Sequence, residues 1–140
     1  MDKLIEAAKK YRENAYAPYS KFKVGAAVLG QNKKIYGGCN IENVSFSLTV
    51  CAERAAIFKA VSEGVKKIEK IAVVTSDINL SVPCGACIQV ILEFAEKAKV
   101  YCCDNKGNYK EYEIKDLMPF FNKKNIFTDK LKESGKDNPK

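Results

Sequence analysis

The spacing of apolar residues changes along the chain from a helical to an alternating pattern. Over residues 1–15, apolar side chains recur at helical spacing among charged ones, which predicts an amphipathic helix that ends between residues 15 and 17, just before Pro18. Apolar residues then alternate with others over 24–28, and strand signals resume over 35–39, beyond a Gly-Gln-Asn turn. This pattern predicts a β-hairpin.

The rest of the sequence passes several times between helical and extended patterns. The expected elements are a loop over 40–49, a helix over 51–61 capped by Gly64, a strand over 71–75, a loop over 76–83, a helix over 84–95, strands over 100–103 and 109–114, and a short helical segment over 116–118. Strands that alternate with helices imply parallel crossovers. The predicted fold class is therefore an α/β layered domain.

The size and charge of the chain indicate how many domains it has and whether it binds nucleic acid. Its 140 residues, 46% of them hydrophobic, suit one domain with one packed core. We place this domain at residues 1–128 and expect the polar segment 129–140 to be a tail. The net charge is +7, but the lysines stand in short groups between acidic and apolar stretches. A solvated basic surface is expected rather than one that binds nucleic acid.

Signals for secretion or membrane insertion are not expected in this sequence. No apolar run approaches the roughly 20 residues of a membrane-spanning helix, and the charges of segment 1–15 do not fit a signal peptide. We therefore expect a cytoplasmic protein that does not bind membranes. Its six cysteines would then lie in a reducing compartment, where clustered thiols more often bind metal or act chemically than form disulfides.

Three of the cysteines stand at the starts of two predicted helices. Cys51-Ala-Glu53 opens the first helix, and Pro83-Cys-Gly-Ala-Cys87 opens the second. The partly positive helix ends lower thiol pKa values, which makes Cys51, Cys84 and Cys87 candidate thiolate ligands. Three thiolates can hold zinc with one position open for water, whereas a structural site fills all four. The sequence has no histidine, so the ligands must be cysteines or carboxylates.

Two charged residues follow closely on Cys51. Cys-x-Glu followed by Pro-Cys-x-x-Cys is similar to the signature of zinc deaminases. By that resemblance, water on zinc would be a source of hydroxide near neutral pH, and Glu53 would carry protons to ring N3 and to the leaving amine of a cytosine base. The alternative is that Glu53 only favours the N-terminal end of a helix. Arg54 can balance the negative charge of three thiolates, or it is an ordinary surface arginine.

Four stretches of the sequence form a combination that is more specific than any one of them. They are residues 17–27 (APYSKFKVGAA), 38–43 (GCNIEN), 49–54 (TVCAER) and 83–89 (PCGACIQ). In this order they resemble the small cytidine deaminase family, in its three-cysteine homotetrameric branch. The resemblance implies a three-layer α/β/α fold around a mixed sheet of about five strands. It also implies hydrolytic deamination of cytidine and 2′-deoxycytidine in pyrimidine salvage.

The resemblance further implies a metal centre with one Zn²⁺ per subunit. Its residues are the ligands Cys51, Cys84 and Cys87, the proton shuttle Glu53, and the supporting residues Arg54 and Gln89. Position 88 departs from the family, because Ile88 stands where an arginine is frequent. Arg54 would then balance the thiolate charge alone.

The implied partner is a free nucleoside. The residues expected to bind it are Phe22, Asn40, Glu42 and Ala52. Phe22 would pack against the pyrimidine, the pair Asn40 and Glu42 would bind the ribose 3′-hydroxyl, and the backbone of Ala52 would meet the base. From the residues alone, Phe22 could equally be core, and Asn40 and Glu42 could be turn residues.

The resemblance also implies a homotetramer in which a C-terminal segment reaches a neighbouring active site. Residues 117–122 (LMPFFN) are similar to a leucine-leucine-proline segment of the family, but Asn122 stands where an aromatic residue is expected. Phe120 or Phe121 would have to replace it.

Three other interpretations of the sequence stay open. A deaminase of bases within RNA or DNA shares the zinc chemistry but needs a basic groove for the strand. Cys39, Cys102 and Cys103 are expected to be core thiols, but a structural zinc module would use Cys39 as a fourth ligand. A deaminase of a modified cytosine nucleoside would share the same residues.

Overall fold

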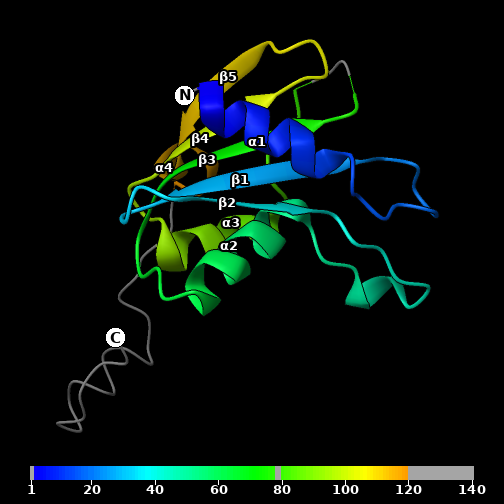
Figure 1. Ribbon diagram of the computed structural model, residues 1–140, viewed down its shortest axis with the longest axis horizontal. Coiled ribbons are helices and arrows are strands. Elements are labelled where there is room, and N and C mark those ends of the chain that lie inside the picture. Colours follow the sequence, from blue (N-terminus) through cyan, green and yellow to red (C-terminus); the bar gives the residue numbers. More distant parts are fainter. Residues whose placement is uncertain (1, 78–79, 120–140) are drawn as a thin grey trace, which may run out of the picture.

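A mixed five-stranded sheet forms the centre of the protein in the computed structural model, which describes residues 2–77 and 80–119. The strands are β1 (Val24–Gly30), β2 (Ile35–Cys39), β3 (Ile68–Thr75), β4 (Lys99–Cys103) and β5 (Tyr109–Glu113). The helices are α1 (Asp2–Arg12), α2 (Ala52–Ser62), α3 (Gly85–Phe94), α4 (Ile114–Leu117) and the 3₁₀ helix η1 (Phe46–Leu48). The order across the sheet is β2-β1-β3-β4-β5, and only β3 and β4 pair in parallel among these strands (Figure 1).

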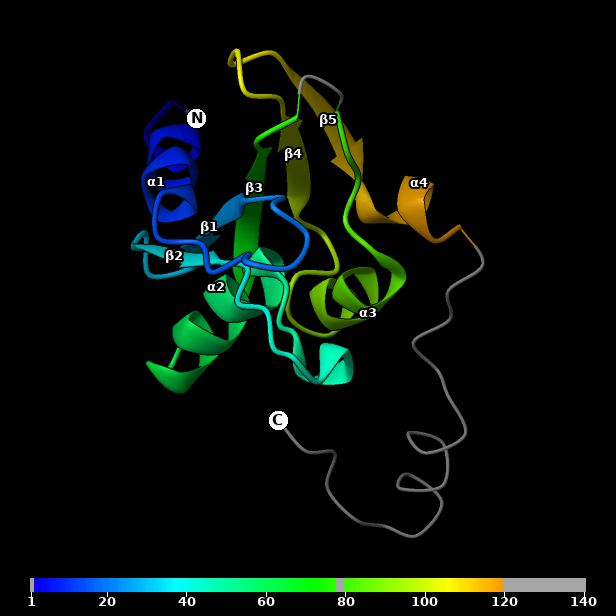
Figure 2. The same ribbon diagram turned by 90° about the vertical axis from the view of Figure 1, so that its right-hand side faces the viewer.

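Helices cover both faces of this sheet. Helix α1 packs on one face, while α2 and α3 lie side by side on the other, as Figures 1 and 2 show. Each face has its own apolar core. Ile57, Ile71 and Ile91 lie in the core on the side of α2 and α3, and the α1 residues Leu4 and Ile5 lie in the core on the other side. The predicted α/β/α layers with a mixed sheet are therefore confirmed.

Glycines on β1 and β2 let the helices approach the sheet closely. A Cβ atom on Gly38 would lie 2.5 Å from the backbone nitrogen of Ala56 in α2. On the opposite face, Cβ atoms on Gly25 and Gly37 would collide with α1. Helix α3 connects the parallel strands β3 and β4, and both α2 and α3 begin near the Thr75 end of β3.

Element boundaries differ from those expected at a few points. Helix α1 ends at Arg12 rather than between residues 15 and 17, because the chain turns to let Tyr16 form a bridge with Ile41. Strand β3 begins at Ile68, three residues before the predicted start, since Lys70 and Ile68 pair with the end of β1. The expected loop 40–49 contains η1, and α4 covers 114–117 rather than 116–118.

Two expectations concern residues outside those that the structure describes. They are the polar tail over 129–140 and the C-terminal segment with Phe120, Phe121 and Asn122. Within the described ranges, no helix combines the length and apolar content that crossing a membrane requires.

Candidate metal and nucleoside site

A cavity of about 310 Å³ opens where α2 and α3 begin. Its wall comes from the segment before β1, the chain between β2 and α2, the end of β3, and the loop before α3. The lining residues are Ser20, Phe22, Val24, Asn40, Glu42, Thr49, Cys51, Ala52, Glu53, Val73, Thr75, Ser81, Val82, Pro83 and Cys84. The structure thus brings Phe22, Asn40, Glu42, Ala52 and Glu53 together with two of the three predicted thiols.

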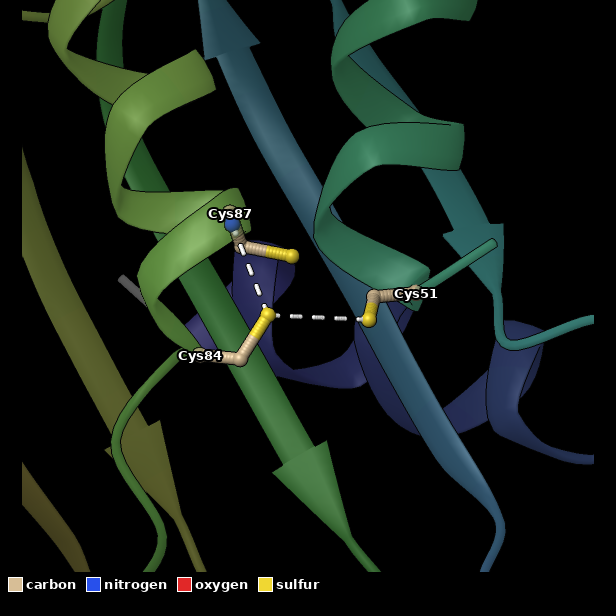
Figure 3. Close-up of side chains that lie close together, drawn as sticks. All are labelled: Cys51, Cys84 and Cys87. Carbon is tan, nitrogen blue, oxygen red and sulfur yellow. Dashed lines mark hydrogen bonds between the residues drawn. The ribbon is translucent and has the colours of Figure 1, made fainter. Parts of the chain in front are cut away.

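The three thiols lie at one end of this cavity. Cys51 and Cys84 are the residues just before α2 and α3, and Cys87 lies in the first turn of α3, as Figure 3 shows. Their sulfur atoms all lie within 4.8 Å of one another, and the Sγ atoms of Cys51 and Cys84 are 3.8 Å apart. Zinc–sulfur bonds of about 2.3 Å in tetrahedral geometry place two sulfurs about 3.8 Å apart. The thiol cluster therefore fits zinc in both donor type and spacing.

Hydrogen bonds to sulfur stabilise the anionic form of this cluster. Cys84 caps α3, because its Sγ accepts a hydrogen bond from the backbone N–H of Cys87 at 3.5 Å. A hydrogen bond from the Cys87 thiol, with help from Arg54, lowers the pKa of Cys51 to about 5, and the same shared proton raises the pKa of Cys87. These contacts favour the thiolate form of Cys51, which is the form of cysteine that binds metal.

Arg54 lies beside the cluster in the first turn of α2. Its Nη2 is 3.6 Å from Cys51 Sγ and 3.4 Å from the carbonyl oxygen of Thr49. The hydrogen bond to Cys51 raises the pKa of the guanidinium. Ile88, by contrast, is buried in the core between the sheet and α3 and carries no charge. Gln89 is exposed, and no hydrogen bond to the thiols is found for it among the described residues.

Glu53 places a carboxyl group inside the cavity. The residue is 5% exposed, and burial raises the pKa of its carboxyl, with the charge of Cys51 acting in the same direction. Ala52, which precedes it, is fully buried and begins α2, so its backbone N–H has no partner within the helix. Glu53 and Ala52 both line the cavity, so a carboxyl that holds its proton more firmly and an N–H that the helix itself leaves unpaired belong to the same wall.

The side chains of Asn40 and Glu42 bind the segment that carries Phe22. Asn40 accepts a hydrogen bond from the N–H of Val24 at 2.9 Å and donates one to the carbonyl of Phe22 at 2.7 Å. Glu42 Oε1 accepts from the N–H groups of Tyr19 and Ser20 at 3.0 and 3.1 Å. These bonds hold Phe22 on the cavity wall, a function that sequence reasoning did not foresee.

The other three cysteines lie away from the thiol cluster. Side chains alternate along a strand, and the positions of Gly37 and Gly38 place Cys39 on the α1 face of the sheet. The sheet therefore separates Cys39 from Cys51, and the structural zinc module with Cys39 as fourth ligand is wrong. Cys102 and Cys103 are buried on β4, and burial raises the pKa of each thiol, as expected of core thiols.

Sequence reasoning missed Thr75 at the end of β3. This residue lines the cavity, is 2% exposed, and its hydroxyl has no hydrogen-bond partner within the described part of the chain. Its strand position alone gives no sign of this, because an inward-facing threonine at a strand end is common.

Three thiols at two helix starts, beside a buried carboxyl, are the arrangement of zinc-dependent deaminases. Residues 1–103 match the family model described as the cytidine and deoxycytidylate deaminase zinc-binding region. The chain belongs to this family.

Individual relatives are similar over most of the chain. A cytidine deaminase of Sporosarcina psychrophila is 51% identical over 120 residues, which cover 85% of this chain and 88% of that protein. A cytidine deaminase of Halalkalibacterium halodurans is 46% identical over 117 residues, 83% of this chain and 89% of that protein. The crystal structure of cytidine deaminase from Burkholderia pseudomallei superposes with a TM-score of 0.82 at 43% identity, covering 85% of this chain and 96% of that one.

Proposed function

We propose that the protein is a cytidine deaminase, which hydrolyses cytidine and 2′-deoxycytidine to uridine and 2′-deoxyuridine with release of ammonia. The observation that carries this proposal is the buried carboxyl of Glu53, which shares one cavity with the thiols and with Phe22. We assign Cys51, Cys84 and Cys87 as ligands of one Zn²⁺ per subunit, because their sulfur spacing fits that ion.

Glu53 moves the protons of the reaction. Zinc, when bound, supplies a Lewis acid that makes water at the site acidic enough to react. Glu53 accepts a proton from the attacking water and gives it to ring N3. It then moves the remaining proton of the added hydroxyl to the exocyclic amine, which leaves C4 as ammonia while the C4 carbonyl of the product forms. Burial raises the pKa of Glu53, so the carboxyl is a stronger base than an exposed glutamate and suits this exchange near neutral pH.

Arg54 balances charge at the thiol cluster. Three thiolates carry one negative charge more than Zn²⁺ cancels, and the guanidinium hydrogen bond to Cys51 offsets part of it. Position 88 on α3 is occupied by the core residue Ile88, so it supplies no second arginine. Gln89, on the same helix, is assigned as a supporting residue from the resemblance to the family.

The pyrimidine lies against Phe22 and accepts a hydrogen bond from the backbone N–H of Ala52, while Asn40 and Glu42 face the ribose. A carboxylate accepts up to about four hydrogen bonds and a side-chain amide donates two, so Glu42 and Asn40 can bind a sugar hydroxyl beside their partners in the protein. Hydrogen bonds from Ser20 and Tyr19 lower the pKa of Glu42, so it offers an ionised acceptor.

The charges on the cavity wall favour a nucleoside over a nucleotide. Among the described lining residues, the ionisable side chains are carboxyls and thiols, and none is lysine or arginine. A 5′-phosphate would meet repulsion without a cation to bind it. We therefore expect deoxycytidine to react much faster than deoxycytidylate, and single-stranded nucleic acid to be a poor substrate for the same reason.

A homotetramer is the assembly that we infer. Several large apolar side chains are exposed on the chain between β2 and α2, among them Val44 at 83%, Phe46 at 66% and Leu48 at 64%. Exposed apolar side chains that gather in one segment favour a protein interface there. Light scattering that gave the mass of an active monomer would contradict this assignment.

We further place the protein in the cytoplasm, in pyrimidine salvage, with its catalytic domain at residues 1–128 and a tail at 129–140. Free thiols support a reducing compartment, since none of the six cysteines forms a disulfide.

The decisive experiment compares the wild-type protein with Glu53→Gln, assaying cytidine turnover, ammonia release and zinc content. Wild-type protein should deaminate cytidine, and the variant should lose about 10²- to 10⁴-fold in kcat at equal zinc content. A folded, zinc-replete wild type without turnover would exclude cytidine and shift the substrate to a modified cytosine nucleoside.

A further inference from the structure

The segment that carries Phe22 is held by a chain of side-chain hydrogen bonds. Glu42, 6% exposed, accepts hydrogen bonds from the backbone N–H groups of Tyr19 and Ser20 at one carboxylate oxygen. The Ser20 hydroxyl in turn accepts a hydrogen bond from the N–H of Phe22 at 3.0 Å. Ser20 therefore connects a buried carboxylate with the backbone of the aromatic residue on the cavity wall.

Side chains satisfy both backbone groups of Phe22. Its N–H donates to Ser20, and its carbonyl accepts from the Asn40 amide at 2.7 Å. Lys21, which lies between Ser20 and Phe22, has a φ of +60°, a left-handed conformation that residues other than glycine disfavour. The segment is thus kept in a conformation that it would not favour alone, and the hydrogen bonds of Ser20 and Asn40 hold it there.

We propose that Ser20 is a positioning residue of the nucleoside site, whose hydroxyl holds the backbone of Phe22 so that its side chain lies on the cavity wall, where it packs against the pyrimidine. The inference rests on the proposed function, because it concerns how that substrate is held. Ser20 lines the cavity, but its hydroxyl already accepts from Phe22 and lies against Glu42. Its influence on the substrate is therefore exerted through Phe22.

Ring packing contributes to substrate binding and to the transition state alike, so its loss raises KM more than it lowers kcat. Ser20→Ala should raise the KM for cytidine about 3- to 10-fold, the size expected for one lost hydrogen bond, and change kcat less than about twofold. Ser20→Thr keeps the hydroxyl and should retain a KM close to that of the wild type.

A double-mutant cycle separates positioning of Phe22 from a general effect on the fold. In a Phe22→Leu background, which lacks the aromatic face, Ser20→Ala should change KM less than about twofold further. An equal loss in both backgrounds would overturn the proposal, because Ser20 would then act independently of Phe22. An unchanged KM for a folded Ser20→Ala protein would overturn it as well.

Ser76 offers a matched control in the same region. Its hydroxyl accepts a hydrogen bond from the backbone N–H of Lys23 at 3.3 Å, but it touches neither backbone group of Phe22. Ser76→Ala should leave KM unchanged, and a loss equal to that of Ser20→Ala would contradict the specific role. Failure of the proposed function gives a different result, namely no turnover of cytidine by the wild-type protein.

Discussion

The Sγ atoms of Cys51 and Cys84 lie 3.8 Å apart, although 32 residues separate them in the sequence and they precede different helices. The distance equals what one tetrahedral zinc ion imposes on two thiolate ligands, about 3.8 Å. The backbone therefore prepares the metal site: α2 and α3 start side by side because both pack on the same face of the sheet.

Replacing one of these sulfurs should abolish zinc binding, whereas replacing a thiol on the other face of the sheet should not. Cys84→Ser is expected to lose its zinc on dialysis and at least about 100-fold in activity, because changes around the ligands alone cost about 10- to 100-fold. The matched control is Cys39→Ser, whose side chain lies on the α1 face. Elemental analysis would show the difference, and zinc loss from Cys39→Ser would contradict the ligand assignment.

Sequence reasoning predicted elements whose signals are local. The hairpin over β1 and β2 follows from alternation, and Gly64 caps α2 with a φ of +98° as its place after the helix indicated. The predicted end of α1 was wrong because the helix end depends on residues that are distant in the sequence. Arg12 donates to the carbonyl of Thr75, 63 residues away, and the chain then turns toward Ile41.

The residues of the candidate site also divide into those with a local sequence signal and those without one. Cys51, Glu53, Cys84 and Cys87 belong to short motifs, which the sequence displays directly. The link from Glu42 through Ser20 to Phe22 joins residues up to 22 apart and has no sequence signature. Hydrogen bonds between loops depend on the folded backbone, so only the structure reveals them.

The turn between β4 and β5 should make stability depend on pH in the acidic range. Asp104 accepts hydrogen bonds from the side chain and backbone of Asn108 and from the backbone of Lys106, which lower the pKa of its carboxyl. This stabilisation is complete above the unfolded-state pKa of about 4 and is lost as pH falls through the lower folded-state pKa.

Asp104→Asn removes that titration. The variant should be less stable than the wild type at neutral pH, and the difference in unfolding midpoint should shrink steadily below about pH 4. Urea unfolding at several pH values measures it. Glu6→Gln, on the exposed side of α1, is a control for loss of one negative charge. A difference that stayed constant down to pH 2 would show that Asp104 contributes no proton linkage.

Two glycines near the thiol cluster should respond oppositely to replacement by alanine. A Cβ atom on Gly38 would lie 2.5 Å from the nitrogen of Ala56 and 2.8 Å from the Cβ atom of Ala55. The helix α2 would have to move away from β2 and carry Cys51 with it. Gly38→Ala should therefore cost about 2 kcal/mol of unfolding free energy and most of the activity.

Gly85 lies between two proposed zinc ligands, yet a Cβ atom there would meet no other atom within 4 Å. It has an ordinary helical conformation in the first turn of α3, where alanine is the better helix former. Gly85→Ala should thus fold with equal or greater stability and keep both zinc and turnover. Thermal unfolding and cytidine assays of the two variants test this directly. If Gly85→Ala were as inactive as Gly38→Ala, the space above Gly85 would have to be filled by the substrate or by a neighbouring subunit.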